Sequence, residues 1–246
     1  MRKSYRELTE EIKTDGERLK LIAALGSSDD LAYHYALICE DWAAGGTLML
    51  ENSFDRHGEA GIVFLLERLR ALGTASKTDE SAAAGTATDT AYLAAKILSQ
   101  LRHRDFYAAR AKELAALLTA RWEISDIALR RKQIIALGWI GSESEINLLI
   151  DSMQSDSDAL CRAWAAAALM QLSFHGVAAD VLREKTKTAF AAAIQKEGDL
   201  NAAGIMIEAA QTLFGKKWIS AAAAEAAESE SIEKARKSTL RFLGKA

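Results

Sequence analysis

The sequence has no proline among its 246 residues and very little valine, which occurs only at positions 63, 177 and 181. Average usage would place about 12 prolines in a chain of this length. Proline interrupts helices and valine favours strands, whereas alanine, which is abundant here, is the strongest helix former. The composition therefore excludes a sheet-based fold and predicts an all-α protein.

The chain also has few cysteines, no long apolar run and no excess of basic residues. Cys39 and Cys161 are the only cysteines, which excludes a disulfide framework or a four-cysteine zinc site. The N-terminus is charged throughout and no apolar run is long enough to cross a bilayer, so we expect neither a secretory signal nor a membrane span. The net charge of -3 lacks the basic excess typical of nucleic-acid binders. A cytoplasmic location is the simplest fit.

Apolar residues recur at helical spacing in blocks of roughly 10 to 20 residues. Four blocks begin at Ser4, Asp126, Asp158 and Asp199, whose side chains can cap a first turn. The small, polar stretch 73–87 fits either a flexible loop or one short helix, and we favour a loop that contains a helical turn. The predicted helices are 4–13, 16–25, 29–43, 58–72, 88–102, 105–121, 126–140, 143–154, 158–173, 177–197, 199–214, 217–227 and 230–243.

Two of these blocks are copies of one another. Segment 125–140, SDIALRRKQIIALGWI, recurs 32 positions later as 157–172, SDALCRAWAAAALMQL. Both copies have an arginine four positions after the aspartate and an Ala-Leu pair near the end. A shorter amphipathic helix at 145–154 lies between them, and weaker copies occupy 91–101 and the segment that ends at 213–215. A repeat of this length indicates stacked helical hairpins.

The paired helices resemble a HEAT repeat, in which a first helix, A, is joined by a turn with aspartate to a second helix, B. The resemblance is strongest over 126–173 and extends more weakly from 88 to 214. It implies an α-α superhelix, a HEAT-like solenoid of about five to seven helical hairpins that forms one domain over 1–246. The proline of many HEAT turns is missing. The residues that carry the resemblance are Cys161-Arg162, Ala165-Ala166, Ala168-Leu169, Leu129-Arg130 and Ala136-Leu137-Gly138.

The repeated aspartates and arginines are open to a catalytic and a structural interpretation. In HEAT-like arrays, residues at these positions link neighbouring turns in a hydrogen-bonded ladder. An arginine fork holds carboxylate or carbonyl oxygens in a fixed geometry, which suits such a link. Because the feature is repeated, we interpret Asp126, Arg130, Asp158 and Arg162 as a structural ladder.

The resemblance places the B helices on the concave side of the solenoid. If Cys161, Ala165 and Leu169 face the core, Trp164 lies on the opposite face of its helix, and the repeat alignment extends this stripe to other helices. Exposed aromatic residues in a groove are typical of binding surfaces. In the alternative, a tightly closed superhelix buries the rings. The predicted partner-binding residues are Tyr92, Lys96, Lys132, Ile135, Trp139, Trp164, Gln171, Glu208 and Gln211.

The sequence contains no recognisable catalytic, metal-binding or cofactor-binding motif. Its four histidines, His34, His57, His103 and His175, are dispersed and lack metal-ligand spacing. No phosphate-binding loop or nucleophile motif occurs. We therefore predict no catalytic residue, no metal site and no cofactor.

These features favour a non-enzymatic scaffold, such as an adaptor or an immunity-type protein, that binds a protein or peptide in its concave groove. One alternative is a HEAT-like alkylpurine DNA glycosylase, which uses concave tryptophans beside a basic groove. Few concave cations and the net negative charge disfavour nucleic acid as the partner. A further alternative is a HEAT-like bilin lyase, although no feature indicates a tetrapyrrole pocket. The sequence leaves the oligomeric state open.

Overall fold

The computed structural model describes residues 2–74, 93, 97, 107–120, 122 and 127–244, and these residues form helices and no strand. The prediction of an all-α fold is therefore confirmed. The chain divides into two compact units, Met1–Arg110 and Ala111–Ala246. The loop predicted at 73–87 lies outside the described residues beyond Thr74, and one continuous domain remains a prediction.

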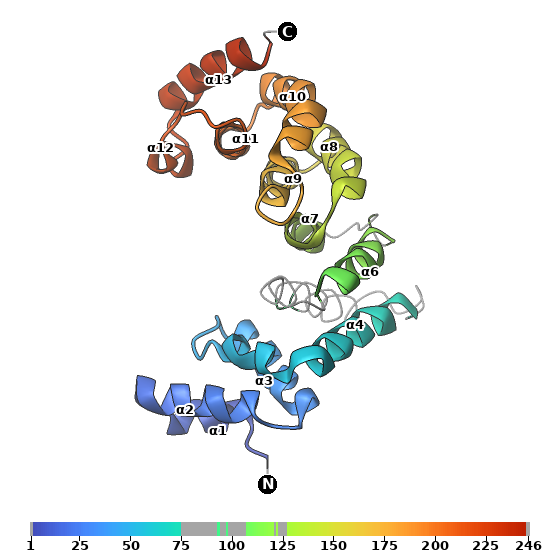
Figure 1. The fold of residues 1–246 in the computed structure, drawn as a ribbon. Coiled ribbons are helices and arrows are strands. Elements are labelled where there is room, and N and C mark those ends of the chain that lie inside the picture. The colour runs from blue at the N-terminus through green and yellow to red at the C-terminus, as the bar shows by residue number, and fades with distance from the viewer. Residues whose placement is uncertain are drawn as a thin grey trace. The chain divides into compact units, whose positions relative to one another are not determined.

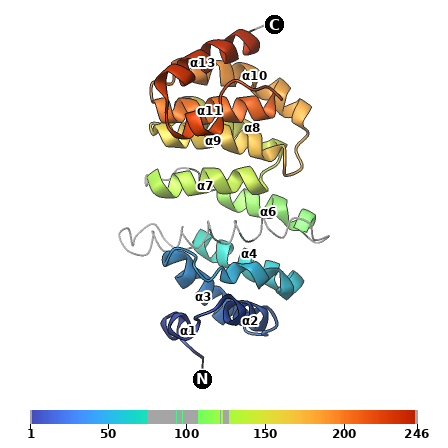
Figure 2. The ribbon, with the colours of Figure 1, turned by 90° about the vertical axis from the view of Figure 1, so that its left-hand side faces the viewer.

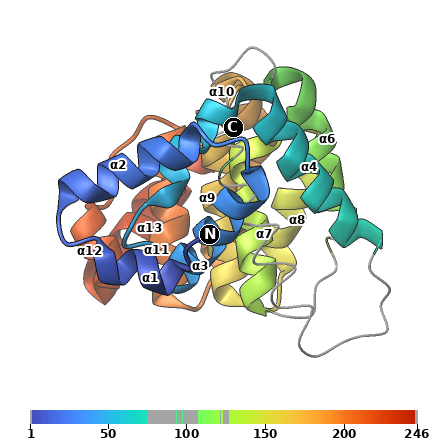
Figure 3. The same ribbon diagram turned by 90° about the horizontal axis from the view of Figure 1, so that it is seen from below.

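The described residues of the N-terminal unit up to Thr74 form four α-helices and one 3-10 helix, drawn in blue to cyan in Figure 3. Ser4 begins the first helix in a capping box with Glu7, as the sequence predicts. The elements of this unit are α1 (Tyr5–Glu11), α2 (Asp15–Gly26), α3 (Leu31–Ala43), η1 (Leu50–His57) and α4 (Gly58–Thr74), and α6 (Tyr107–Thr119) continues across the boundary between the units.

The 3-10 helix η1 was not predicted, because a buried carboxylate from another element shapes the backbone before it. Asp41 of α3 accepts hydrogen bonds from the backbone N–H groups of Leu48, at 2.9 Å, and Leu50, at 3.2 Å. It also accepts one from the Tyr5 hydroxyl at 2.8 Å. Between the two bonded amides, Met49 has a φ of 53°, which is uncommon outside glycine. A side-chain contact from the preceding helix thus determines this turn.

The C-terminal unit is built from two layers of helices (Figure 1). The B layer consists of α7, α9 and α11, and α9 packs between the other two. The A helices α8 and α10 pack against this layer and against each other, as expected of an all-α solenoid. The elements of this unit are α7 (Ile127–Ile140), η2 (Glu143–Glu145), α8 (Ile146–Ser155), α9 (Ala159–Leu172), α10 (Ala179–Lys196), α11 (Leu200–Leu213), α12 (Ala221–Glu225) and α13 (Ser229–Leu243).

Capping aspartates and small side chains explain this packing. Asp158 and Asp199 accept hydrogen bonds from the backbone N–H of Cys161 and Ala202, so both predicted N-caps are confirmed. Alanine is frequent at the buried positions of α9 and α11, which allows the B helices to approach one another closely. One close approach involves Gly138 of α7, where a Cβ added to the glycine would lie 2.8 Å from the Ala168 Cα atom.

We expect Gly138→Ala to lower the free energy of unfolding of the C-terminal unit by about 1 to 2 kcal/mol. The added methyl group would also meet the Ala168 side chain at 2.9 Å, so α7 and α9 would have to move apart. Urea unfolding checks this, with Gly198→Ala as the matched control, because a Cβ there meets nothing within 4 Å. Equal stability of Gly138→Ala and wild type would contradict the close packing.

Candidate functional site

One face of α9 is only partly covered by the protein. Cys161, Ala165 and Leu169 are buried against the core, whereas Trp164 and Gln171 are half-buried. Four of the half-buried residues of this helix, Leu160, Trp164, Ala167 and Gln171, are spaced three or four residues apart and therefore share one side of the helix.

The same side is also only partly covered on the two neighbouring helices, α7 and α11. Aligning α7 and α11 with α9 by the 32-residue repeat and by their N-cap aspartates gives three rows of equivalent positions. Figure 2 shows α11, α9 and α7 one below the other, so these rows cross three adjacent helices. We call this surface the B face. Its rows are Lys132, Trp164 and Ile205; Ile135, Ala167 and Glu208; and Trp139, Gln171 and Thr212, all half-buried except the exposed Thr212.

Most of the described residues predicted for partner binding lie on the B face, namely Lys132, Ile135, Trp139, Trp164, Gln171 and Glu208. Tyr92 and Lys96 lie outside the described residues. Whether any of them binds a partner remains a prediction.

Gln211 was predicted to contact a partner, but its side chain is bonded within the protein. Ile205 lies on the B face although it was not among the predicted residues. The Gln211 side-chain oxygen accepts hydrogen bonds from the backbone N–H groups of Trp218, at 2.8 Å, and Ile219, at 3.0 Å. This side chain therefore holds the loop between α11 and α12. Ile205 occupies the position equivalent to Trp164, and aligning the N-cap aspartates Asp158 and Asp199 would have identified it.

The described ladder residues, Arg130, Asp158 and Arg162, form ion pairs between successive repeats with residues that were not predicted for the ladder. Arg130 of α7 donates two hydrogen bonds to Asp156, at 2.7 and 2.8 Å. Arg162 of α9 does the same with Glu197, also at 2.7 and 2.8 Å. Asp158 instead pairs with Arg131, at 2.8 Å to each oxygen. Asp126 lies outside the described residues.

Asp156 and Glu197 are equivalent acidic residues that end the A helices α8 and α10. Each also accepts a hydrogen bond from the backbone N–H two residues later, that of Asp158 or Asp199. Burial raises the pKa of Glu197, but its hydrogen bonds with Arg162 and with the backbone N–H groups of Gly198 and Asp199, together with the Arg162 charge, outweigh this effect and leave the pKa below its usual value. The carboxylate is therefore charged in the folded protein.

The ladder ends at α11, where Ala203 occupies the position equivalent to Arg162. In place of a further ladder arginine, Arg236 of α13 contacts the C-terminal end of α10. It donates hydrogen bonds to the backbone oxygens of Ile194, at 3.0 Å, and Glu197, at 2.7 Å. The C-terminal helix thus satisfies carbonyl groups that an α-helix leaves unpaired.

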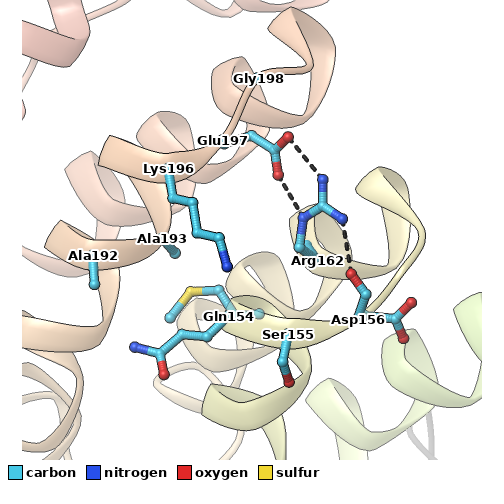
Figure 4. Close-up of a pocket in the computed structure, with 10 residues that line it drawn as sticks. Gln154, Ser155, Asp156, Arg162, Ala192, Ala193, Lys196, Glu197 and Gly198 are labelled. Atoms are coloured by element: carbon cyan, nitrogen blue, oxygen red, sulfur yellow. Dashed lines mark hydrogen bonds and ion pairs between the residues drawn. The ribbon is translucent and has the colours of Figure 1, made fainter.

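A cavity of about 440 Å³ lies between the ends of α8 and α10, beside the Arg162 ion pair (Figure 4). Met153 and Ala193 provide apolar walls, and both are buried. The lining residues are Met153, Gln154, Ser155, Asp156, Arg162, Ala192, Ala193, Lys196, Glu197 and Gly198.

The described residues contain no cluster that could hold a metal ion, since no three or more histidine, cysteine, aspartate or glutamate side chains gather there in a suitable arrangement. None of the described helices has the length and apolar character needed to cross a membrane.

A family model for HEAT repeats matches residues 80–170. The match includes α7, α8 and nearly all of α9, the part of the protein in which the repeated Asp and Arg positions occur. No curated protein and no solved structure matches the sequence.

Proposed function

We propose that this HEAT-repeat protein is a scaffold whose B face binds a protein or peptide partner. The observation that carries the proposal is the position of Trp164, which is half-buried on the middle helix of three. Ile205 occupies the equivalent position on α11, and Ile135 lies one turn further on α7. A tryptophan set among aliphatic side chains on a continuous helical surface is a common anchor for a protein partner.

The rigidity and composition of the B face support a protein as its ligand. Its side chains project from packed helices, so binding does not have to order a loop, which would cost conformational entropy. The polar groups at its edges, Glu208 on α11 and Gln171 on α9, provide hydrogen-bonding positions around the apolar centre. An apolar centre with a polar rim is the usual composition of a protein interface.

The experiment places a photo-activatable amino acid at position 164, at position 205 or, as a control, at position 188. Thr188 is exposed on the A helix α10. In extract of the native host, we expect positions 164 and 205 to capture the same protein and position 188 not to capture it. Capture of nucleic acid from the B face, or of nothing, would overturn the proposal.

We expect Trp164→Ala to weaken binding of that protein by about 2 kcal/mol, or roughly 30-fold in Kd. The variant removes an anchor that is only partly packed into the core, so helicity should be retained. Isothermal titration calorimetry measures the affinity, and circular dichroism verifies the fold. Thr188→Ala is the matched surface control. An unchanged Kd for Trp164→Ala would place the binding surface elsewhere.

A further inference from the structure

The cavity between α8 and α10 has one uncommitted charge. Among the residues that line it, Lys196 forms no ion pair or side-chain hydrogen bond with the part of the protein that the structure describes. Figure 4 shows its side chain extending from α10 toward Gln154 and Ser155 of α8. Lys196 is an exposed residue, and it is therefore available to a ligand.

The carboxylates of the cavity are already occupied. Glu197 is held by two of the three nitrogens of the Arg162 guanidinium and by the backbone N–H of Asp199. Asp156 is held in the same way by Arg130 and by the backbone N–H of Asp158. A cationic ligand would have to break one of these pairs to gain a partner, whereas an anionic ligand gains Lys196 without breaking any. The residues that line the cavity therefore favour the binding of an anionic ligand over a cationic one.

The size and chemistry of the cavity restrict which anion it suits. A volume of about 440 Å³ is at the small end of ligand sites and accommodates a side chain or a short peptide end. Met153 and Ala193 can contact methylene groups, and Gln154, which also lines the cavity, has an amide group that can donate a hydrogen bond. Phosphate groups are usually held by several N–H donors or arginines, but Arg162 here is committed to Glu197.

We propose that this cavity binds a carboxylate group, presented by an acidic side chain of a peptide or by the C-terminal end of a peptide, with Lys196 as its charged contact. The site lies at the turns between A and B helices and not on the B face. It therefore does not depend on the proposed scaffold function, and either proposal can fail without the other.

The test uses the protein of 246 residues, labelled with ¹⁵N, and three tripeptides with blocked N-termini in a nuclear magnetic resonance titration. One peptide has a central glutamate and an amidated end, the second has only alanines and a free C-terminal carboxylate, and the third replaces the glutamate by glutamine. We expect at least one carboxylate peptide to bind with a Kd of about 1 mM. Its signals should shift at Gln154, Ser155 and Lys196, and the glutamine peptide should cause no such shift.

Comparison of the two carboxylate peptides distinguishes an acidic side chain from a peptide end. We expect Lys196→Met to weaken binding by about fivefold and Lys196→Arg to retain it. Lys237→Met is the matched control, because Lys237 is an exposed lysine on α13. Equal binding of the glutamine peptide, an unchanged affinity in Lys196→Met, or tighter binding of inorganic phosphate would each overturn the proposal.

Discussion

An Arg162→Ala variant is expected to lose about 3 kcal/mol of the unfolding free energy of the C-terminal unit. The loss is large because the partner of Arg162 is buried: the Glu197 side chain is only 1% exposed, while that of Arg162 is 22% exposed. Removing the arginine leaves a buried carboxylate without its counter-charge, and such a group is far more costly than a lost surface pair. The backbone oxygen of Asp156, which Arg162 also contacts at 2.8 Å, loses a donor too.

Urea unfolding, followed by ¹⁹F signals of fluorinated Trp139, Trp164 and Trp218, measures this loss within the C-terminal unit. Arg241→Ala is the matched control, because Arg241 is exposed on α13, and its effect should be within about 0.5 kcal/mol. The double variant Arg162→Ala/Glu197→Ala should recover part of the loss, since it no longer contains the unpaired charge. A stable Arg162→Ala variant with lost partner binding would instead make Arg162 a binding residue.

The helices and their faces could be predicted from the sequence because both depend on local spacing. Buried positions such as Cys161 and Leu169 recur at the helical period, so the opposite positions, such as Trp164, follow directly. The N-caps Ser4, Asp158 and Asp199 likewise act within their own first turn.

The partners of the ladder could not be predicted in the same way. Arg162 pairs with Glu197, 35 positions away, and this pairing depends on where α10 ends and how it packs against α9. The Asp-x-Asp sequence at 156–158 and the Glu-x-Asp sequence at 197–199 share a pattern, and comparing them would have indicated the first acidic residue of each. The contact of Gln211 with the loop before α12 depends on tertiary structure in the same way.

The N-terminal unit contains a pair of histidines, the buried His34 and the half-buried His57, whose arrangement local patterns do not encode. The His34 ring is fully buried, and its Nε2 atom lies 3.0 Å from the backbone oxygen of Leu50. Because a carbonyl oxygen only accepts, Nε2 carries the proton and Nδ1 has a lone pair. The Nε2 atom of His57 lies 2.8 Å from the Nδ1 atom of His34 and donates a hydrogen bond to its lone pair. Protonation of His34 at Nδ1 would place two N–H groups against each other.

We expect the N-terminal unit to lose stability when the pH falls below about 6.5. Burial, with a smaller effect of His57, lowers the pKa of His34 from 6.5 to about 4, although the hydrogen bond with Leu50 opposes this shift. Burial also lowers the pKa of His57, while the nearby Asp55 carboxylate opposes this. Between pH 6.5 and 4 the unfolded protein binds more protons than the folded one. The loss attributable to His34 therefore reaches about 3 kcal/mol at pH 4 and is absent above pH 7.

Trp42 of α3 is the one tryptophan within residues 1–110, so the ¹⁹F signal of its fluorinated form reports unfolding of the N-terminal unit by urea. The measurement compares wild type with His34→Gln at pH 7, 5.5 and 4, because glutamine can donate to Leu50 but does not titrate. Carboxylates that titrate near pH 4 contribute to both proteins and cancel in the difference. We expect the stability of wild type to fall more steeply than that of His34→Gln over this range. Parallel pH profiles would show that the His34 imidazole is not held neutral by the fold.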